Sequence, residues 1–244
     1  MGQYLVLALT RGSRPWLLLL SLAGWGWLLG SAGMLSIPSF CTSLPLAGYA
    51  LGWQGIEQAL LFNPPRQLLL AWLLMLLAMT PMLLVHPLTY VWQRSLLRKR
   101  WQAVALFLLG FATVWTLMGL LLMTVVVLSR VWLGVSETPA FIACLALCLV
   151  WQASPIKQRC LNHCHHQPRI SAFGLGFVRD CLGFGLSSGL WCIGSCWPLM
   201  LLPMLAEQGH VALMALCMGW MLYERMQRPR PAHWHWPFAL RWRR

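Results

Sequence analysis

The sequence predicts an all-α protein, a polytopic bundle of about six transmembrane helices. Hydrophobic residues make up 59% of the 244 residues and charged residues only 9%, which is far from the composition of a soluble globular protein. The apolar residues form long runs separated by short basic clusters, as in membrane proteins whose cytoplasmic loops carry Lys and Arg. The net charge of +13 therefore indicates contact with an anionic lipid bilayer and not with nucleic acid.

Six apolar runs have the length of a membrane span or come close to it. They cover residues 16–33, 68–91, 101–128, 139–153, 183–205 and 211–223, and the fourth and sixth are short for a bilayer of ~30 Å. No small-residue cleavage site clearly follows the first run, so we expect a retained helix and not a cleaved signal peptide. Residues 1–224 are thus predicted to form one bundle domain, and residues 225–244 a basic cytoplasmic tail containing Trp and His.

The distribution of Lys and Arg predicts the orientation of the bundle. Six spans bring both termini to one side, and that side carries all of the 18 Lys and Arg except Arg66 and Arg130. Because basic loops stay on the cytoplasmic side, we expect the N-terminus and the C-terminus inside. The long outer segment, residues 34–65, is apolar and broken by prolines, which indicates an interfacial or re-entrant segment, with a helix near residues 53–62 as one option.

One stripe of the fifth run combines sulfur side chains with bare backbone. At about 100° per residue on a helix, it is formed by Cys181, Gly185, Gly189, Cys192, Cys196 and Met200. Small residues let a neighbouring helix approach closely, while sulfur atoms offer ligands to a soft ion. From the stripe alone, close helix packing and metal binding are both open.

A second cysteine pair precedes this run. Cys160 and Cys164 are one helical turn apart, with His163 between them, so two thiolates and an imidazole could meet one ion. Thiols on the cytosolic side stay reduced, and we expect Lys157 and Arg159 to lower their pKa. Soft thiolates select Cu(I), with Zn²⁺ the next candidate. The alternative is a solvated loop with incidental cysteines.

The second run carries a thioether stripe. Met75, Met79, Met82 and His86 lie within about 60° of one another around a helix, an arrangement that suits Cu(I) moving by ligand exchange. Methionines in apolar helices also pack in cores, and this interpretation is favoured for Met75 and Met82. An ionisable residue inside a span indicates function, although His86 could instead bond a carbonyl released by Pro87.

No Ser/His/Asp set, phosphate-binding glycine loop or carboxylate pair can be made out, so we expect no enzyme. Two other classes of function remain as alternatives. One is a membrane thiol-disulfide oxidoreductase, although cysteines four residues apart on a regular helix are poorly placed for a bridge. The other is a structural partner that holds another membrane complex together.

Three motifs connect the chain to a known family, over about two thirds of its length. They read Ala78-Met79-Thr80-Pro81 followed by Arg98-Lys99-Arg100, then Gln152-x-x-Pro155-x-Lys157-x-x-Cys160-x-x-x-Cys164, and Gly189-x-x-Cys192-x-Gly194-x-Cys196-Trp197-x-Leu199-Met200. In these residues the chain resembles the bacterial family described as predicted metal-binding integral membrane proteins. Members usually carry a further Cys where this chain has Ser195, and a second Met where it has Thr80.

The resemblance implies metal binding by a protein of the bacterial inner membrane. The family is often labelled a copper chaperone, with members linked to supplying copper to oxidases such as tyrosinase, which is a handling role and not catalysis. We therefore expect a protein that binds Cu(I) and delivers it to a copper-dependent enzyme or moves it across the inner membrane, with two groups of ligands and two adjoining residues. They are Cys160, Cys164 and His163 at the inner mouth, Cys192, Cys196 and Met200 within the bundle, and Met79 and His86 beside them.

Overall fold

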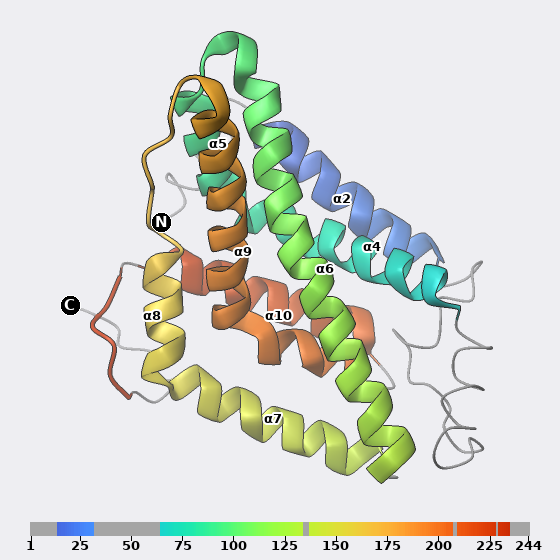
Figure 1. Cartoon of the computed structure of the whole chain (residues 1–244). Helices are drawn as coiled ribbons and strands as arrows, with labels where there is room; N and C mark the ends of the chain where they lie inside the picture. Colours follow the sequence, from blue (N-terminus) through green and yellow to red (C-terminus); the bar gives the residue numbers. More distant parts are fainter. Residues whose placement is uncertain (1–13, 32–63, 134–136, 207–208, 228, 235–244) are drawn as a thin grey trace.

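The computed structural model describes residues 14–31, 64–133, 137–206, 209–227 and 229–234, and in these residues every regular element is a helix (Figure 1). The prediction of an all-α chain is therefore confirmed. In chain order the elements are α2 (Arg14–Ser31), α4 (Pro65–Leu83), α5 (Val85–Arg94), the 3-10 turn η1 (Leu97–Lys99), α6 (Arg100–Leu133), α7 (Glu137–Ala153), α8 (Pro155–His163), α9 (Gly174–Leu205) and α10 (His210–Arg225).

Three of these helices are long and apolar enough to cross a membrane. They contain the segments Arg66–Leu83, Leu97–Leu128 and Gly174–Leu205, and α7 with α8 make a fourth candidate if this pair, bent by 67°, counts as one span. Helix α2 is apolar but shorter, and α10 has 16 residues. The six predicted runs all contain helix, while the count of six spans stays a prediction. The outer segment at residues 34–65 lies almost entirely outside the described residues.

Helices α6 and α9 form the central pair, and glycine brings them together (Figure 1). A Cβ atom on Gly185 would lie 2.1 Å from the carbonyl oxygen of Phe107, and one on Gly110 would lie 2.6 Å from that of Leu182. Only a residue without a side chain permits this approach of two backbones. The sulfur and glycine stripe of α9 is buried along its length, from Cys181 to Met200, so its packing role is confirmed.

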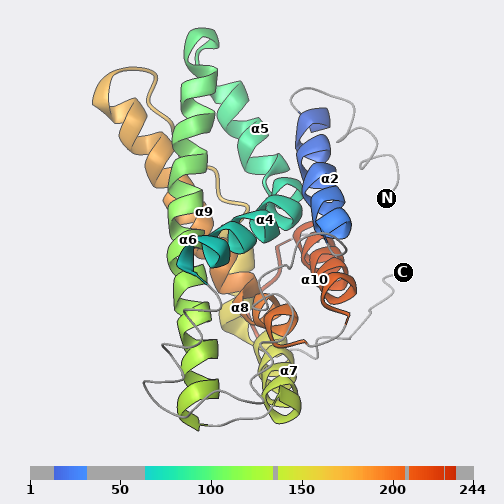
Figure 2. The ribbon, with the colours of Figure 1, turned by 90° about the vertical axis from the view of Figure 1, so that its right-hand side faces the viewer.

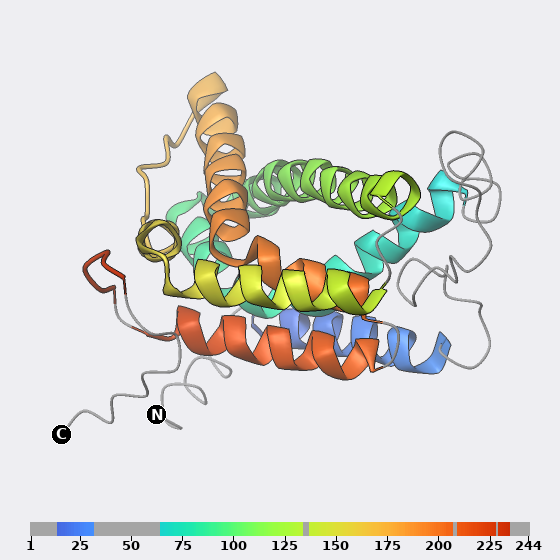
Figure 3. The same ribbon diagram turned by 90° about the horizontal axis from the view of Figure 1, so that it is seen from below.

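The remaining helices pack onto this pair or onto one another (Figure 2). Helix α2 packs on α4, where the Ser21 hydroxyl donates to the Ala78 carbonyl at 2.7 Å. Helix α10 contacts both α9 and α4, and α8 packs on α9. Helix α7 runs beside the C-terminal part of α9, which follows another direction from its N-terminal part (Figure 3). The middle of α9 is therefore contacted from several sides.

The predicted span at residues 68–91 is not one helix, which corrects the sequence analysis. Helix α4 ends at Leu83, Leu84 forms a turn, and α5 begins at Val85. Pro87 has no N–H group, so the Leu83 carbonyl lacks its helical donor. The guanidinium of Arg225 in α10 donates to this carbonyl instead, with an Nη1 to oxygen distance of 3.3 Å. A proline in α5 thus creates the acceptor that ties α4 to α10.

A second proline has the same effect in α9. Pro198 deprives the Gly194 carbonyl of its helical donor, and the indole Nε1 of Trp151 in α7 donates to that oxygen at 3.0 Å. The two indole rings of Trp151 and Trp197 also meet edge to face, with centroids 5.3 Å apart. Helix α7 is therefore fixed to α9 one turn from the buried cysteines.

Candidate functional site

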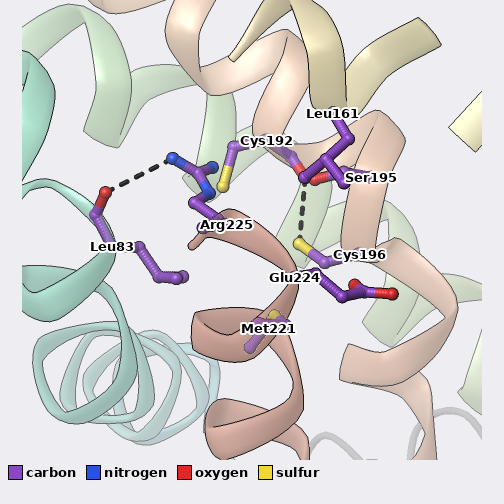
Figure 4. A pocket seen from close by; sticks show the side chains of 8 residues that line it. All are labelled: Leu83, Leu161, Cys192, Ser195, Cys196, Met221, Glu224 and Arg225. Atoms are coloured by element: carbon purple, nitrogen blue, oxygen red, sulfur yellow. Dashed lines mark hydrogen bonds between the residues drawn. The ribbon is translucent and has the colours of Figure 1, made fainter. Parts of the chain in front are cut away.

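A small cavity lies where α8, α9 and α10 meet α4 (Figure 4). Its volume is about 10 Å³, room for one water-sized group. Helix α9 contributes Cys192, Ser195 and Cys196, and α10 contributes Met221, Glu224 and Arg225, with Leu83 and Leu161 closing the remaining sides. Sulfur from three side chains, one carboxylate and one guanidinium thus border the same space.

The structure brings the two predicted cysteine pairs together. Cys160 packs directly on α9, because a Cβ atom on Gly194 would lie 2.6 Å from the Cys160 sulfur. The Cys164 side chain lies next to Ser195 and within electrostatic reach of Cys192. Residues about 30 positions apart in the sequence therefore share one junction, since α8 folds back along the middle of α9.

The thiols of this junction are not arranged around an ion. The Cys196 sulfur donates to the Cys192 carbonyl at 2.9 Å, and the Ser195 hydroxyl donates to the same oxygen at 2.7 Å. Within the described residues, no three His, Cys, Asp or Glu side chains form a group that could hold a metal ion. Turning the Cys196 thiol into the cavity costs one hydrogen bond, about 1 kcal/mol, and Ser195 still satisfies the carbonyl.

Arg225 is the residue that sequence reasoning missed. Its guanidinium is held by the Leu83 carbonyl and faces the Cys192 sulfur, with Cys164 and Cys196 also within electrostatic reach (Figure 4). The sequence places it beside Glu224, which suggests a local ion pair. Glu224 instead pairs with Lys157 of α8, which also donates to Gln152. One feature of the sequence could have indicated Arg225: it is a charged residue at the end of an apolar run, and charged residues at such positions tend to be functional because their burial is costly.

Trp115 completes the surroundings of Cys192. The indole is fully buried in α6, and its Nε1 has no hydrogen-bond acceptor of good geometry among the described residues. This N–H group faces the Cys192 sulfur. The indole N–H group and the guanidinium therefore both lie close to the Cys192 sulfur.

The prediction that Lys157 and Arg159 lower the pKa of the Cys160 and Cys164 thiols is wrong. Burial raises the pKa of Cys164 to about 11, and the nearby Arg225 only partly opposes this effect. Lys157, which was expected to lower the pKa, is occupied by Glu224 and Gln152. Cys164 is thus a neutral thiol at neutral pH, because its environment excludes water more than it supplies positive charge.

The predicted methionines lie in the core but not at the cavity. Met79 and Met200 are fully buried, and neither lines the cavity. Met221 of α10 does line it, and no pattern in the sequence singled it out. A thioether is a neutral soft donor, so Met221 is the methionine best placed to contact an ion between α9 and α10.

The predicted histidines lie further out. His163 stacks on Trp191, with ring centroids 4.2 Å apart, and its side chain is exposed. His86 is exposed on α5, and its imidazole lies within electrostatic reach of His165. Partial desolvation, followed by Arg225 and His86, lowers the pKa of His165, which favours the neutral imidazole that metals bind. The ligand roles of His163 and His86 stay predictions.

Comparison with known proteins gives one match. The family model for PpoB2, described as "Copper chaperone", matches residues 69–240. This range includes α4 to α10 and therefore both cysteine pairs, Met221 and Arg225. Comparisons with curated proteins and with solved structures find no match.

Proposed function

The chain belongs to the PpoB2 copper chaperone family, and from this premise we propose that it holds Cu(I) between α8, α9 and α10 and passes it to a copper-dependent enzyme. Membership supports a copper-handling role. The observation that carries the proposal is the meeting of Cys164 from the α8 end with Cys192 and Cys196 of α9 beside one cavity. Free thiols gathered beside one small cavity suit a soft monovalent ion.

We assign the ion to two thiolates, those of Cys192 and Cys196, with Met221 as a neutral third donor. Both cysteines are buried, so water competes poorly for the ion. Structural Zn²⁺ sites take four ligands from Cys, His and carboxylate groups, whereas the cavity offers only Cys192, Cys196 and the Glu224 carboxylate, which is paired with Lys157, and this favours Cu(I). The ion would then reach the cavity along a route formed by Cys160, Cys164 and His163. The candidates for its onward path remain Met200, Met79 and His86.

The proposed setting is the bacterial inner membrane, with several helices crossing it. Helix α6 supports this setting, because large apolar side chains remain exposed on it: Leu109, Leu117, Leu120 and Leu121 are 53–63% exposed. A continuous leucine surface of this kind fits lipid better than water. From such a position the protein would supply copper to an oxidase of the tyrosinase type, as a carrier and not as a catalyst.

The test is anaerobic titration of the purified full chain with Cu(I) against a colorimetric chelator. We expect one tightly bound ion in the wild type and its loss when Cys192→Ser and Cys196→Ser are combined. The matched control combines Cys144→Ser and Cys148→Ser, a buried pair with the same spacing on α7 that does not line the cavity. Unchanged stoichiometry in the first double variant, or equal loss in both, would contradict the proposal.

A further inference from the structure

Arg225 places a fixed positive charge at the wall of the cavity. A guanidinium keeps its proton at all physiological pH values. Its position is set by the Leu83 carbonyl, which is available only because Pro87 has no N–H group. In the part of the chain that the structure describes, no salt bridge joins Arg225 to a carboxylate, while the neighbouring charges of Lys157 and Glu224 cancel each other.

The charge of the loaded cavity then depends on the charge of the ion. Two thiolates around a monovalent ion leave one net negative charge, which the guanidinium neutralises. Two thiolates around a divalent ion are already neutral, so the guanidinium leaves one uncompensated positive charge at a partly buried site. Uncompensated buried charge is strongly unfavourable, whereas a paired and hydrogen-bonded charge is tolerated.

We propose that Arg225 is a specificity-determining residue of this site: its fixed charge beside Cys192 and Cys196 selects a monovalent soft ion and rejects divalent ions of equal affinity for sulfur. The inference rests on the proposed function, and it adds that the site distinguishes metal ions by their charge. Sulfur alone does not discriminate well between Cu(I), Zn²⁺ and Cd²⁺, since thiolates bind all three. The counter-charge adds discrimination by charge to the preference that the number of ligands already gives.

A purely structural role for Arg225 predicts a different result. If the guanidinium only ties α10 to the Leu83 carbonyl, its removal lowers stability and weakens every ion alike. If it acts through charge, its removal changes the ratio of monovalent to divalent affinity. The ratio of affinities is therefore the measurement that separates the two roles.

The experiment uses Ag(I) and Cd²⁺ as probes, because both bind thiolates strongly and neither changes oxidation state. Dissociation constants are measured on the purified full chain for the wild type, Arg225→Gln, Arg225→Lys and the matched control Arg230→Gln, which removes an exposed charge just beyond α10. We expect Arg225→Gln to reduce the Ag(I) to Cd²⁺ affinity ratio by about tenfold or more, the size of one nearby charge at intermediate dielectric. Arg225→Lys and Arg230→Gln should keep the ratio.

Several outcomes would overturn the inference. A ratio unchanged in Arg225→Gln, or reduced as strongly in Arg225→Lys, shows that charge at this position does not select the ion. If Arg225→Gln does not fold, Arg225→Met, which keeps an unbranched side chain without the charge, is measured in its place: a ratio reduced tenfold supports the inference, and an unchanged ratio refutes it. Failure of the wild type to bind Ag(I) and Cu(I) at all would instead refute the proposed function.

Discussion

Replacing Gly185 by Ala tests whether the α6–α9 contact positions the site. The added Cβ would lie 2.1 Å from the Phe107 carbonyl oxygen, and real Cβ contacts essentially never fall below 3.0 Å, so the two helices must separate by about 0.9 Å there. Overpacking costs ~3 kcal/mol at the upper end, and a gap of this size forfeits a quarter to a half of the dispersion energy of the separated atoms. The better helix propensity of Ala returns about 1 kcal/mol. The net loss is about 2 kcal/mol.

Gly183→Ala is the matched control, because it lies on the same helix and an added Cβ there meets nothing within 4 Å. For a chain of this length we expect Gly185→Ala to lower the apparent melting temperature in detergent by about 4–8 °C and Gly183→Ala to leave it unchanged or raise it slightly. Copper binding should weaken in the first variant alone, since Cys192 lies two turns further along the same face. Equal stability of the two variants would refute the reasoning.

Three further predictions concern the site and its frame. Met221→Leu should weaken Cu(I) binding about tenfold without loss of stability. The control Met214→Leu changes a methionine that is buried on the same helix away from the cavity, and it should leave Cu(I) binding unchanged. Competition with a chelator measures the Cu(I) affinity of each variant. Because burial raises the pKa of Cys164 to about 11, its alkylation rate, followed by mass spectrometry, should rise about tenfold per pH unit from pH 7 to pH 10; a plateau below pH 9 would contradict this. Trp151→Phe leaves the carbonyl freed by Pro198 unpaired and should cost about 1–3 kcal/mol in thermal unfolding, but much less in a Pro198→Ala background that restores its N–H donor. Equal costs in the two backgrounds would show that this hydrogen bond does not matter.

The sequence predicts the buried stripe of α9 well, because helical periodicity depends only on local geometry. Cys181, Gly185 and Cys192 were expected on one face, and the structure buries all three. Cys164 lies next to Ser195 of this face, a contact that the periodicity of α9 does not contain. The family assignment also followed from local motifs.

The break after α4 and the position of Arg225 could not be predicted in the same way. Pro87 indicates a released carbonyl, but its partner comes from a helix about 140 residues later. No periodicity within one segment contains that information. The raised pKa of Cys164 is also a tertiary property, because it depends first on the burial of the thiol by other parts of the chain.

The contact between Cys160 and Gly194 gives the junction a defined register. The sulfur occupies the volume where any other residue at position 194 would carry its first side-chain atom, so α8 sits in a notch of α9. A single absent methyl group therefore fixes how far α8 can slide along α9. Because this contact sets the position of α8 along α9, it also sets the distance between the thiol of Cys164 and the buried thiol of Cys192.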